Sequence, residues 1–163
     1  MLSKSNKTIY LVLHNIRSAY NVGSIFRTAD GAGVAKIYLC GYTPIPDEPK
    51  VIKTALGAEG FVSWEKHRQT GRLLNQLKKQ GTDIVALELD PKSKGLFDYD
   101  FASLPSKSLA IVVGHERKGL TKNILSYVDD IIEIPMHGKK ESLNVAVATG
   151  VVLYQIIEKS FNN

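Results

Sequence analysis

The chain has 163 residues, enough for one domain that buries roughly two-thirds of the surface its unfolded form exposes. Its 21 Lys and Arg against 16 Asp and Glu give a formal net charge of +5, which suits an anionic partner without identifying one. The one cysteine, Cys40, excludes an internal disulfide framework, and the scattered histidines show no zinc-site spacing, so we expect no metal.

No segment has the pattern of an export signal or a membrane span. Residues 1–7 are polar and lack the apolar centre of a signal peptide. The longest apolar run, residues 145–157, is interrupted by polar residues and is too short to cross a bilayer. We therefore expect a cytoplasmic protein with no membrane contact.

Short apolar, β-rich segments alternate with helical patterns along the chain. Six segments are predicted strands: residues 9–13, 36–40, 61–64, 84–89, 109–113 and 131–134. This alternation predicts an α/β fold, with a mostly parallel sheet and helices on both faces. Cys40 and Trp64 end two of these strands, and we expect both to be packed, Trp64 in the core or in an interface.

Between the first two predicted strands, apolar residues recur with the period of a helix, at Val22, Ile25, Phe26 and Ala29. Asn21 and Arg27 lie off this stripe, so they can face solvent or substrate while the helix is anchored behind them. Residues 41–49 contain three prolines and predict a loop, followed by a short helix at 51–56. Residues 69–80 predict an amphipathic surface helix.

The last predicted strand runs into Ile134 and Met136, and the chain then turns through Gly138 to a helix predicted to open with Ser142 and Asn144. Backbone amides, small polar side chains and an apolar wall would meet there, as in a ligand pocket. Ser and Asn are also common helix caps. This segment alone therefore leaves ligand binding and simple capping open.

Nucleotide-dependent oxidoreductases share the alternating pattern of strands and helices. Their fingerprint, Gly-x-Gly-x-x-Gly, follows the first strand, where this chain has His14-Asn15-Ile16-Arg17-Ser18. The sequence therefore disfavours that class.

Three segments, in this order, carry a more specific pattern: residues 21–33 (NVGSIFRTADGAG), 111–120 (IVVGHERKGL) and 134–145 (IPMHGKKESLNV). Together they resemble the three signature motifs of the SpoU-type, TrmH-like branch of the SPOUT RNA methyltransferases. That family methylates the ribose 2′-hydroxyl of tRNA and rRNA. The resemblance implies an α/β fold with a deep C-terminal trefoil knot, a feature that the periodicity of the sequence does not reveal.

The resemblance also implies S-adenosyl-L-methionine as the cofactor, in a pocket built from Leu87, Gly114, Ile134, Met136, Ser142 and Leu143. A glycine allows close backbone approach, and Ile134 and Leu143 offer apolar walls. Taken singly, the three apolar residues Leu87, Ile134 and Leu143 fit an ordinary core better than a cofactor pocket.

For catalysis, the resemblance points to Arg27, Asn21, Glu116, Ser142 and Asn144. A guanidinium stays protonated near neutral pH, so we expect Arg27 to grip an RNA phosphate and fix the ribose rather than act as a simple base. Glu116 is expected to pair with Arg27 or to orient Asn21; the alternative is a solvated loop carboxylate. His115 and His137 occupy variable motif positions and receive no catalytic role.

These observations predict an S-adenosylmethionine-dependent RNA ribose 2′-O-methyltransferase acting on tRNA or rRNA. The alternative is a catalytically inactive RNA-binding module of the same fold.

We expect one domain over residues 1–163, with no appended RNA-binding domain. Basic residues beside the motifs, such as Lys50, Lys53 and Arg117, are expected to be available for RNA. Residues 145–157 are apolar on more than one face, and in the resembling family this helix packs against a second subunit, so we expect a homodimer built on the first and last helices.

Overall fold

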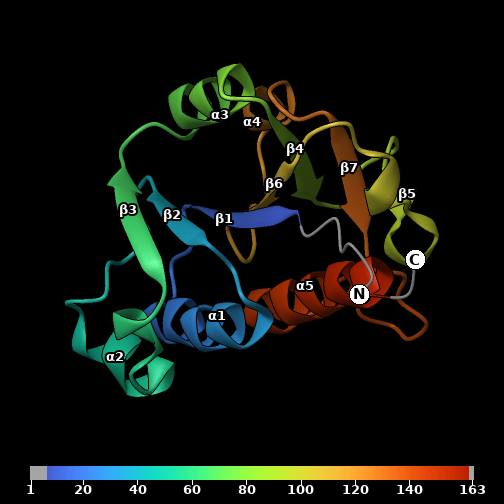
Figure 1. Ribbon diagram of the computed structural model, residues 1–163. Helices are drawn as coiled ribbons and strands as arrows, with labels where there is room; N and C mark the ends of the chain where they lie inside the picture. The colour runs from blue at the N-terminus through green and yellow to red at the C-terminus, as the bar shows by residue number, and fades with distance from the viewer. Residues whose placement is uncertain (1–6, 162–163) are drawn as a thin grey trace.

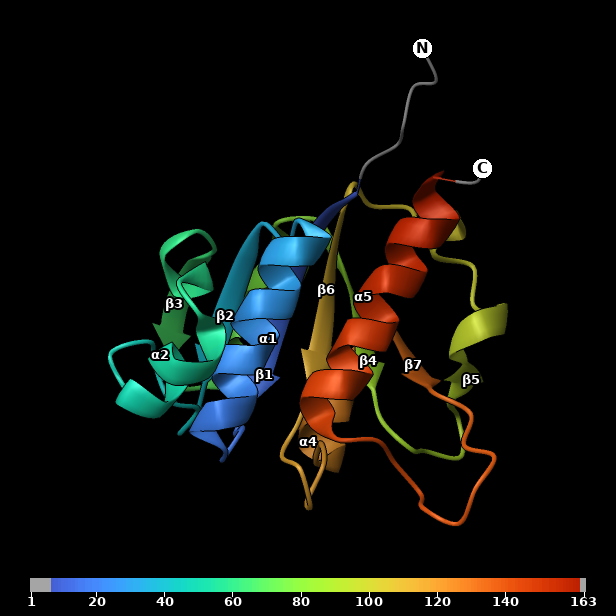
Figure 2. The same cartoon turned by 90° about the horizontal axis from the view of Figure 1, so that it is seen from below.

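The computed structural model describes residues 7–161, which build a seven-stranded parallel sheet with helices on both faces (Figures 1 and 2). The N-terminal segment 1–7, which we expect not to be a signal peptide, lies outside the described residues except for Lys7. The strands are β1 (Thr8–His14), β2 (Lys36–Cys40), β3 (Ser63–His67), β4 (Thr82–Leu87), β5 (Lys94–Gly95), β6 (Ser108–Val113) and β7 (Asp130–Glu133). They are ordered β3-β2-β1-β6-β4-β7-β5, and every pairing is parallel.

Two long helices, α1 (Ala19–Ala32) and α5 (Val145–Phe161), lie side by side on one face of the sheet. The opposite face carries α3 (Thr70–Lys79) and the short α4 (Lys122–Leu125), as Figure 1 shows. Helix α2 (Pro49–Ala55) packs against α1, and single 3₁₀ turns occur at Ala58–Gly60, Leu96–Asp98 and Phe101–Ser103. Within residues 7–161, no helix is long and apolar enough to cross a membrane.

Each face of the sheet buries its own apolar cluster. Beneath α1 and α5, Leu11, Phe26 and Val152 belong to the larger cluster and are fully shielded from solvent. Beneath α3, Leu74 and Val112 belong to the smaller one. The central strands are buried on both faces, which is why β6 reads as an unbroken apolar run, Leu109 to Val113.

The predicted α/β class, with helices on both faces of the sheet, is confirmed. The predicted strand at 61–64 is misplaced, because β3 begins at Ser63 and Phe61 is 80% exposed at the end of a 3₁₀ turn. β3 is an edge strand, so its register is set by pairing with β2 rather than by its own apolar residues. The predicted strand at 84–89 ends at Leu87, and β5 and α4 were not predicted.

Cys40 and Trp64 differ in burial. Cys40 is a buried free thiol at the end of β2, as predicted, and burial raises its pKa to about 12. Trp64 lies on the edge strand with 37% of its surface exposed, so the prediction of a core position for it is wrong.

The strand order determines which loops meet. β4 lies between β6 and β7, so the chain after β6 must pass β4 to reach β7. Parallel strands present their carboxyl ends at the same edge, where ligands bind in open α/β sheets. Residues 88–93, 114–121 and 134–144 therefore gather at one edge of the sheet.

Candidate functional site

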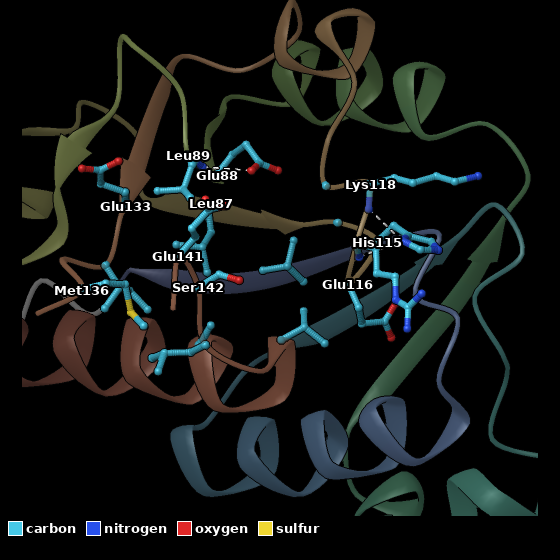
Figure 3. A pocket seen from close by; sticks show the side chains of 18 residues that line it. Leu87, Glu88, Leu89, His115, Glu116, Lys118, Glu133, Met136, Glu141 and Ser142 are labelled. Carbon is cyan, nitrogen blue, oxygen red and sulfur yellow. Dashed lines mark hydrogen bonds between the residues drawn. The ribbon is translucent and has the colours of Figure 1, made fainter. Parts of the chain in front are cut away.

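A cavity of about 290 Å³ lies at the carboxyl ends of β4, β6 and β7, beside the start of α5 (Figure 3). We call it the strand-end cavity. Its lining includes all six residues expected to hold a cofactor: Leu87, Gly114, Ile134, Met136, Ser142 and Leu143. Their role as cofactor ligands stays a prediction, but the fold brings the six together around one space.

Gly114 is required by the shape of this cavity. A Cβ at this position would lie 2.7 Å from Leu120 Cδ2 and 2.9 Å from both the carbonyl carbon and the oxygen of Gly119. The loop after β6 folds back over Gly114, where the Gly119 amide donates to the His115 carbonyl at 2.9 Å. A side chain at residue 114 would therefore push this loop away from its place in the wall.

Besides Glu116, three further carboxylates line the strand-end cavity, at Glu88, Glu133 and Glu141 (Figure 3). Glu88 accepts hydrogen bonds from the amides of Leu89 at 2.9 Å and Leu120 at 2.7 Å, so it ties the end of β4 to the loop after β6. Sequence reasoning missed these residues, although Glu88 directly follows the predicted cofactor residue Leu87. The four carboxylates outnumber the two cations of the lining, Arg117 and Lys118, so the charge of the cavity favours a cationic ligand over a pyrophosphate.

Glu116 connects the loop after β6 to the start of α1. Its carboxylate accepts from the backbone amides of Arg17 and Ser18, each at 3.1 Å, and from Asn21 Nδ2 at 3.2 Å. The expectation that Glu116 orients Asn21 agrees with this contact. The solvated-carboxylate alternative is wrong, because three donors hold the side chain.

The charge of Glu116 is fixed by these partners. Burial by itself raises the pKa of the carboxyl, but the hydrogen bonds from backbone amides and from Asn21 outweigh burial and lower the pKa below its ordinary value. Glu116 is therefore an anion at neutral pH.

Replacing Glu116 with glutamine should destabilise the fold in a pH-dependent way. Because the folded-state pKa is lowered, the stabilisation is present above the unfolded pKa of about 4.3 and is lost as pH falls through the folded value. We expect Glu116→Gln to lower the unfolding free energy by about 2 kcal/mol near neutral pH, and by progressively less in acid. Urea denaturation at several pH values measures this, with the exposed Glu141→Gln as the control. An equal loss at every pH would contradict it.

Asn144 joins the start of α5 to the same network. Its Oδ1 accepts from the amides of Ala146 at 2.9 Å and Val147 at 3.3 Å, which caps the helix, and its Nδ2 donates to Asn21 Oδ1 at 3.2 Å. Asn144 therefore both caps α5 and belongs to the hydrogen-bond network of Asn21 and Glu116. The expectation that the helix opens with Ser142 is wrong: α5 begins at Val145, and Ser142 lies in the preceding loop facing the cavity.

Arg27 stands apart from the other predicted catalytic residues. It is exposed on α1, nearly two helical turns beyond Asn21, and is absent from the lining of the strand-end cavity. Within residues 7–161, no carboxylate lies within ion-pair distance of its guanidinium, so the suggested pairing with Glu116 is wrong. The structure thus groups Asn21, Glu116 and Asn144, and leaves Arg27 free on the surface of the subunit.

His115 shapes the wall of the cavity. Its Nδ1 accepts from the backbone amides of Arg117 and Lys118, each at 3.0 Å, which curls the loop after β6. Figure 3 shows His115 and Glu116 on the α1 side of the cavity, with Met136, Glu141 and Ser142 on the α5 side. No sequence pattern indicates this role, because it depends on the contact between the ring and the backbone of its own loop.

Comparison with known proteins agrees with this geometry. The chain is 33% identical over 156 residues to a tRNA (guanosine(18)-2′-O)-methyltransferase of Aquifex aeolicus, covering 95% of this chain and 71% of the relative. It is 33% identical over 159 residues to a 23S rRNA (guanosine-2′-O-)-methyltransferase of Vibrio vulnificus, covering 98% of this chain and 62% of that protein. The chain thus spans about two-thirds of the length of these curated relatives.

Comparison with solved structures also finds RNA methyltransferases. The fold superposes with a TM-score of 0.86 on an AdoMet-bound rRNA methyltransferase from Sinorhizobium meliloti, at 27% identity over 96% of this chain and 58% of that one. The A. aeolicus TrmH/SpoU tRNA modifying enzyme gives 0.82 at 29% identity, over 96% of this chain and 77% of that one. The model of the SpoU rRNA Methylase family matches residues 8–154, a range that contains the sheet, the strand-end cavity and the Glu116 network. The chain therefore belongs to the SpoU rRNA Methylase family.

Proposed function

We propose that this protein transfers a methyl group from S-adenosylmethionine to a ribose 2′-hydroxyl of tRNA or rRNA. The observation that carries the proposal is the strand-end cavity, whose six expected cofactor residues adjoin the Glu116, Asn21 and Asn144 network. The names of the Aquifex and Vibrio relatives, both ribose 2′-O-methyltransferases, support the reaction, and the AdoMet-bound Sinorhizobium structure supports the cofactor.

The lining of the strand-end cavity fits S-adenosylmethionine. Gly114 lets the loop after β6 fold into the wall of the cavity, and Ile134 and Leu143 supply apolar surface. Glu88, Glu133 and Glu141 supply negative charge suited to a ligand that carries an ammonium and a sulfonium. When bound, this cofactor supplies a methyl group attached to a positively charged sulfur.

Residues of the chain then have to position the RNA. An in-line displacement requires the ribose hydroxyl to be held in contact with the methyl group and aligned with it. Asn21, fixed by Glu116 and Asn144, presents a rigid polar group beside the cavity. Arg27 grips an RNA phosphate and fixes the ribose, which lowers the barrier through positioning and charge stabilisation.

The inactive RNA-binding module is the competing function. It would keep the fold while losing the residues of the site, yet Asn21, Glu116 and Asn144 are present and hydrogen-bonded to one another. A nucleotide-dependent oxidoreductase is further disfavoured by the four carboxylates of the cavity, which outnumber its two cations and disfavour a pyrophosphate.

A homodimer explains the position of Arg27. Arg27 and Gly31 are exposed in the C-terminal half of α1, and Val147 and Tyr154 are about half exposed on α5. The two surfaces adjoin, since a Cβ on Gly31 would lie 3.0 Å from Tyr154 Oη. A second subunit covering this surface would bury the apolar side chains and bring its own Arg27 toward the first subunit's cavity, giving a composite site.

The finer features of the architecture belong to the same proposal. The position of β4 between β6 and β7 supports the deep C-terminal knot, because the chain must pass the loop after β4 on its way to α5. One continuous sheet supports a single methyltransferase domain over residues 1–163. A cytoplasmic location follows from tRNA or rRNA as the substrate.

S-adenosylmethionine and its demethylated product should bind the purified protein without added metal. The cavity supplies backbone, apolar and carboxylate groups, so binding needs no further ligand from a metal ion. Isothermal calorimetry with S-adenosylmethionine, and with NAD as the comparison, measures this. A folded protein that gives no heat and no thermal shift with S-adenosylmethionine, or that prefers NAD, would exclude the proposed enzyme.

A further inference from the structure

A second cavity, of about 580 Å³, lies next to the strand-end cavity and shares His115, Glu116 and Arg117 with it. We call it the α1–α2 groove. Its other lining residues come from the start of α1 and from the segment that leads into α2: Arg17, Ser18, Ala19, Tyr20, Pro44, Glu48 and Lys50. The two cavities therefore meet at the loop after β6.

The floor of the α1–α2 groove is rigid. Glu116 holds the amides of Arg17 and Ser18, and the Tyr20 carbonyl accepts from Thr54 Oγ1 at 2.8 Å, which ties the start of α1 to α2. The side chains above this floor are thus presented by a fixed backbone, close to the Glu116 and Asn21 contact.

The exposed groups of the groove have the chemistry of a nucleotide site. Arg17, Lys50 and Arg117 supply three cations, and all are exposed. Tyr20 exposes 43% of its surface, and Lys50 Nζ lies 6.0 Å from the centre of its ring. A base stacked on Tyr20 would therefore place its phosphate near Lys50. Cations that follow a backbone, combined with an aromatic platform, are typical of single-stranded nucleic-acid sites.

We propose that the α1–α2 groove binds an unpaired nucleotide of the RNA substrate, with its base on Tyr20 and its phosphates near Arg17, Lys50 and Arg117. This inference rests on the proposed methyltransferase function. A base paired within a duplex has both faces stacked on its neighbours, so Tyr20 can only take a base that has left the helix. The groove thus selects a loop or an extruded nucleotide, in the same subunit whose cavity holds the cofactor.

The test measures fluorescence anisotropy of a labelled single-stranded oligouridine, and of an RNA duplex of the same length, with the full-length protein. Tyr20→Ala should weaken single-strand binding about tenfold, and Tyr20→Phe should retain it, since stacking needs only the ring. Phe61→Ala, which removes an exposed aromatic ring outside the groove, should bind as the wild type does. Equal affinities for Tyr20→Ala and Phe61→Ala would overturn the proposal.

Variants of two lysines, one inside the groove and one outside it, test the cationic part of the groove. Lys50 lines the groove, whereas Lys53, also exposed on α2, does not. Lys50→Ala should reduce the slope of log affinity against log salt by about 0.7, the value for one phosphate contact in a single strand, and Lys53→Ala should leave the slope unchanged. Glu48→Gln removes one of the two acidic side chains of the groove, the one that makes no capping hydrogen bond to α2, and should tighten binding. A duplex that binds as tightly as the single strand, with the same dependence on Tyr20, would also overturn the proposal.

Cofactor titration of the same variants separates this inference from the proposed function. If the wild type binds S-adenosylmethionine and methylates RNA while Tyr20→Ala binds RNA normally, the groove assignment fails and the enzyme stands. If the wild type binds no S-adenosylmethionine, the function itself fails.

Discussion

Arg27→Ala should reduce RNA methyl transfer by about a hundredfold to a thousandfold, the cost of removing one charge-stabilising donor from an active site. Affinity for S-adenosylmethionine should change little, because Arg27 is absent from the lining of the strand-end cavity. Stability should also hold, since the side chain is exposed and has no ion pair within residues 7–161.

Arg27→Lys should recover little of the lost activity. An ammonium carries the same charge, but it does not reproduce the two parallel hydrogen bonds that a guanidinium makes to a phosphate. Arg72→Ala, on the exposed side of α3, is the matched control for loss of a surface arginine. Methyl incorporation from labelled cofactor into RNA from cells lacking the gene measures the rate, and calorimetry measures cofactor binding. Turnover of Arg27→Ala close to that of the wild type would show that the role given to Arg27 is wrong.

Gly114→Ala should abolish cofactor binding and activity. The new methyl group would press within 3 Å of Leu120 and the Gly119 backbone, so the loop carrying His115 and Glu116 would have to move. Gly138→Ala is the matched control, because a Cβ on Gly138 meets no atom within 4 Å. Cofactor affinity by calorimetry distinguishes the two variants, and normal affinity in Gly114→Ala would mean that the cofactor binds elsewhere.

Mixing these two inactive variants should restore activity if the site is composite. An Arg27→Ala subunit keeps its cavity, and a Gly114→Ala subunit keeps its arginine, so a mixed dimer has one site with both intact. Random exchange should recover about a quarter of the wild-type activity, because half of the dimers are mixed and each has one working site of two. Sedimentation velocity gives the oligomeric state in parallel. An active monomer, or mixtures that stay inactive although subunits exchange, would exclude the shared site.

Local sequence patterns determined the fold class and most of the elements. The stripe of Val22, Ile25, Phe26 and Ala29 predicted the buried face of α1, and all four are fully shielded from solvent. Residues 69–80 predicted α3, which runs from Thr70 to Lys79. These patterns are reliable because the period of apolar residues reports directly which face of a helix or strand is buried. The bounds of the edge strand β3 were predicted wrongly, since neither Trp64 in the strand nor Phe61 before it is buried.

The sequence also determined which segments carry the site, because the three motifs resemble a known family in residue type and order. Only the tertiary structure decided how their side chains meet. Glu116 reaches Ser18 and Asn21 across 98 and 95 positions of chain, and Asn144 reaches Asn21 across 123. Such contacts depend on the strand order β1-β6-β4-β7, which sets the neighbouring loops and has no local signature. For the same reason, the separation of Arg27 from the strand-end cavity and the convergence of Tyr20, Lys50 and Arg117 in one groove became visible only once the chain was folded.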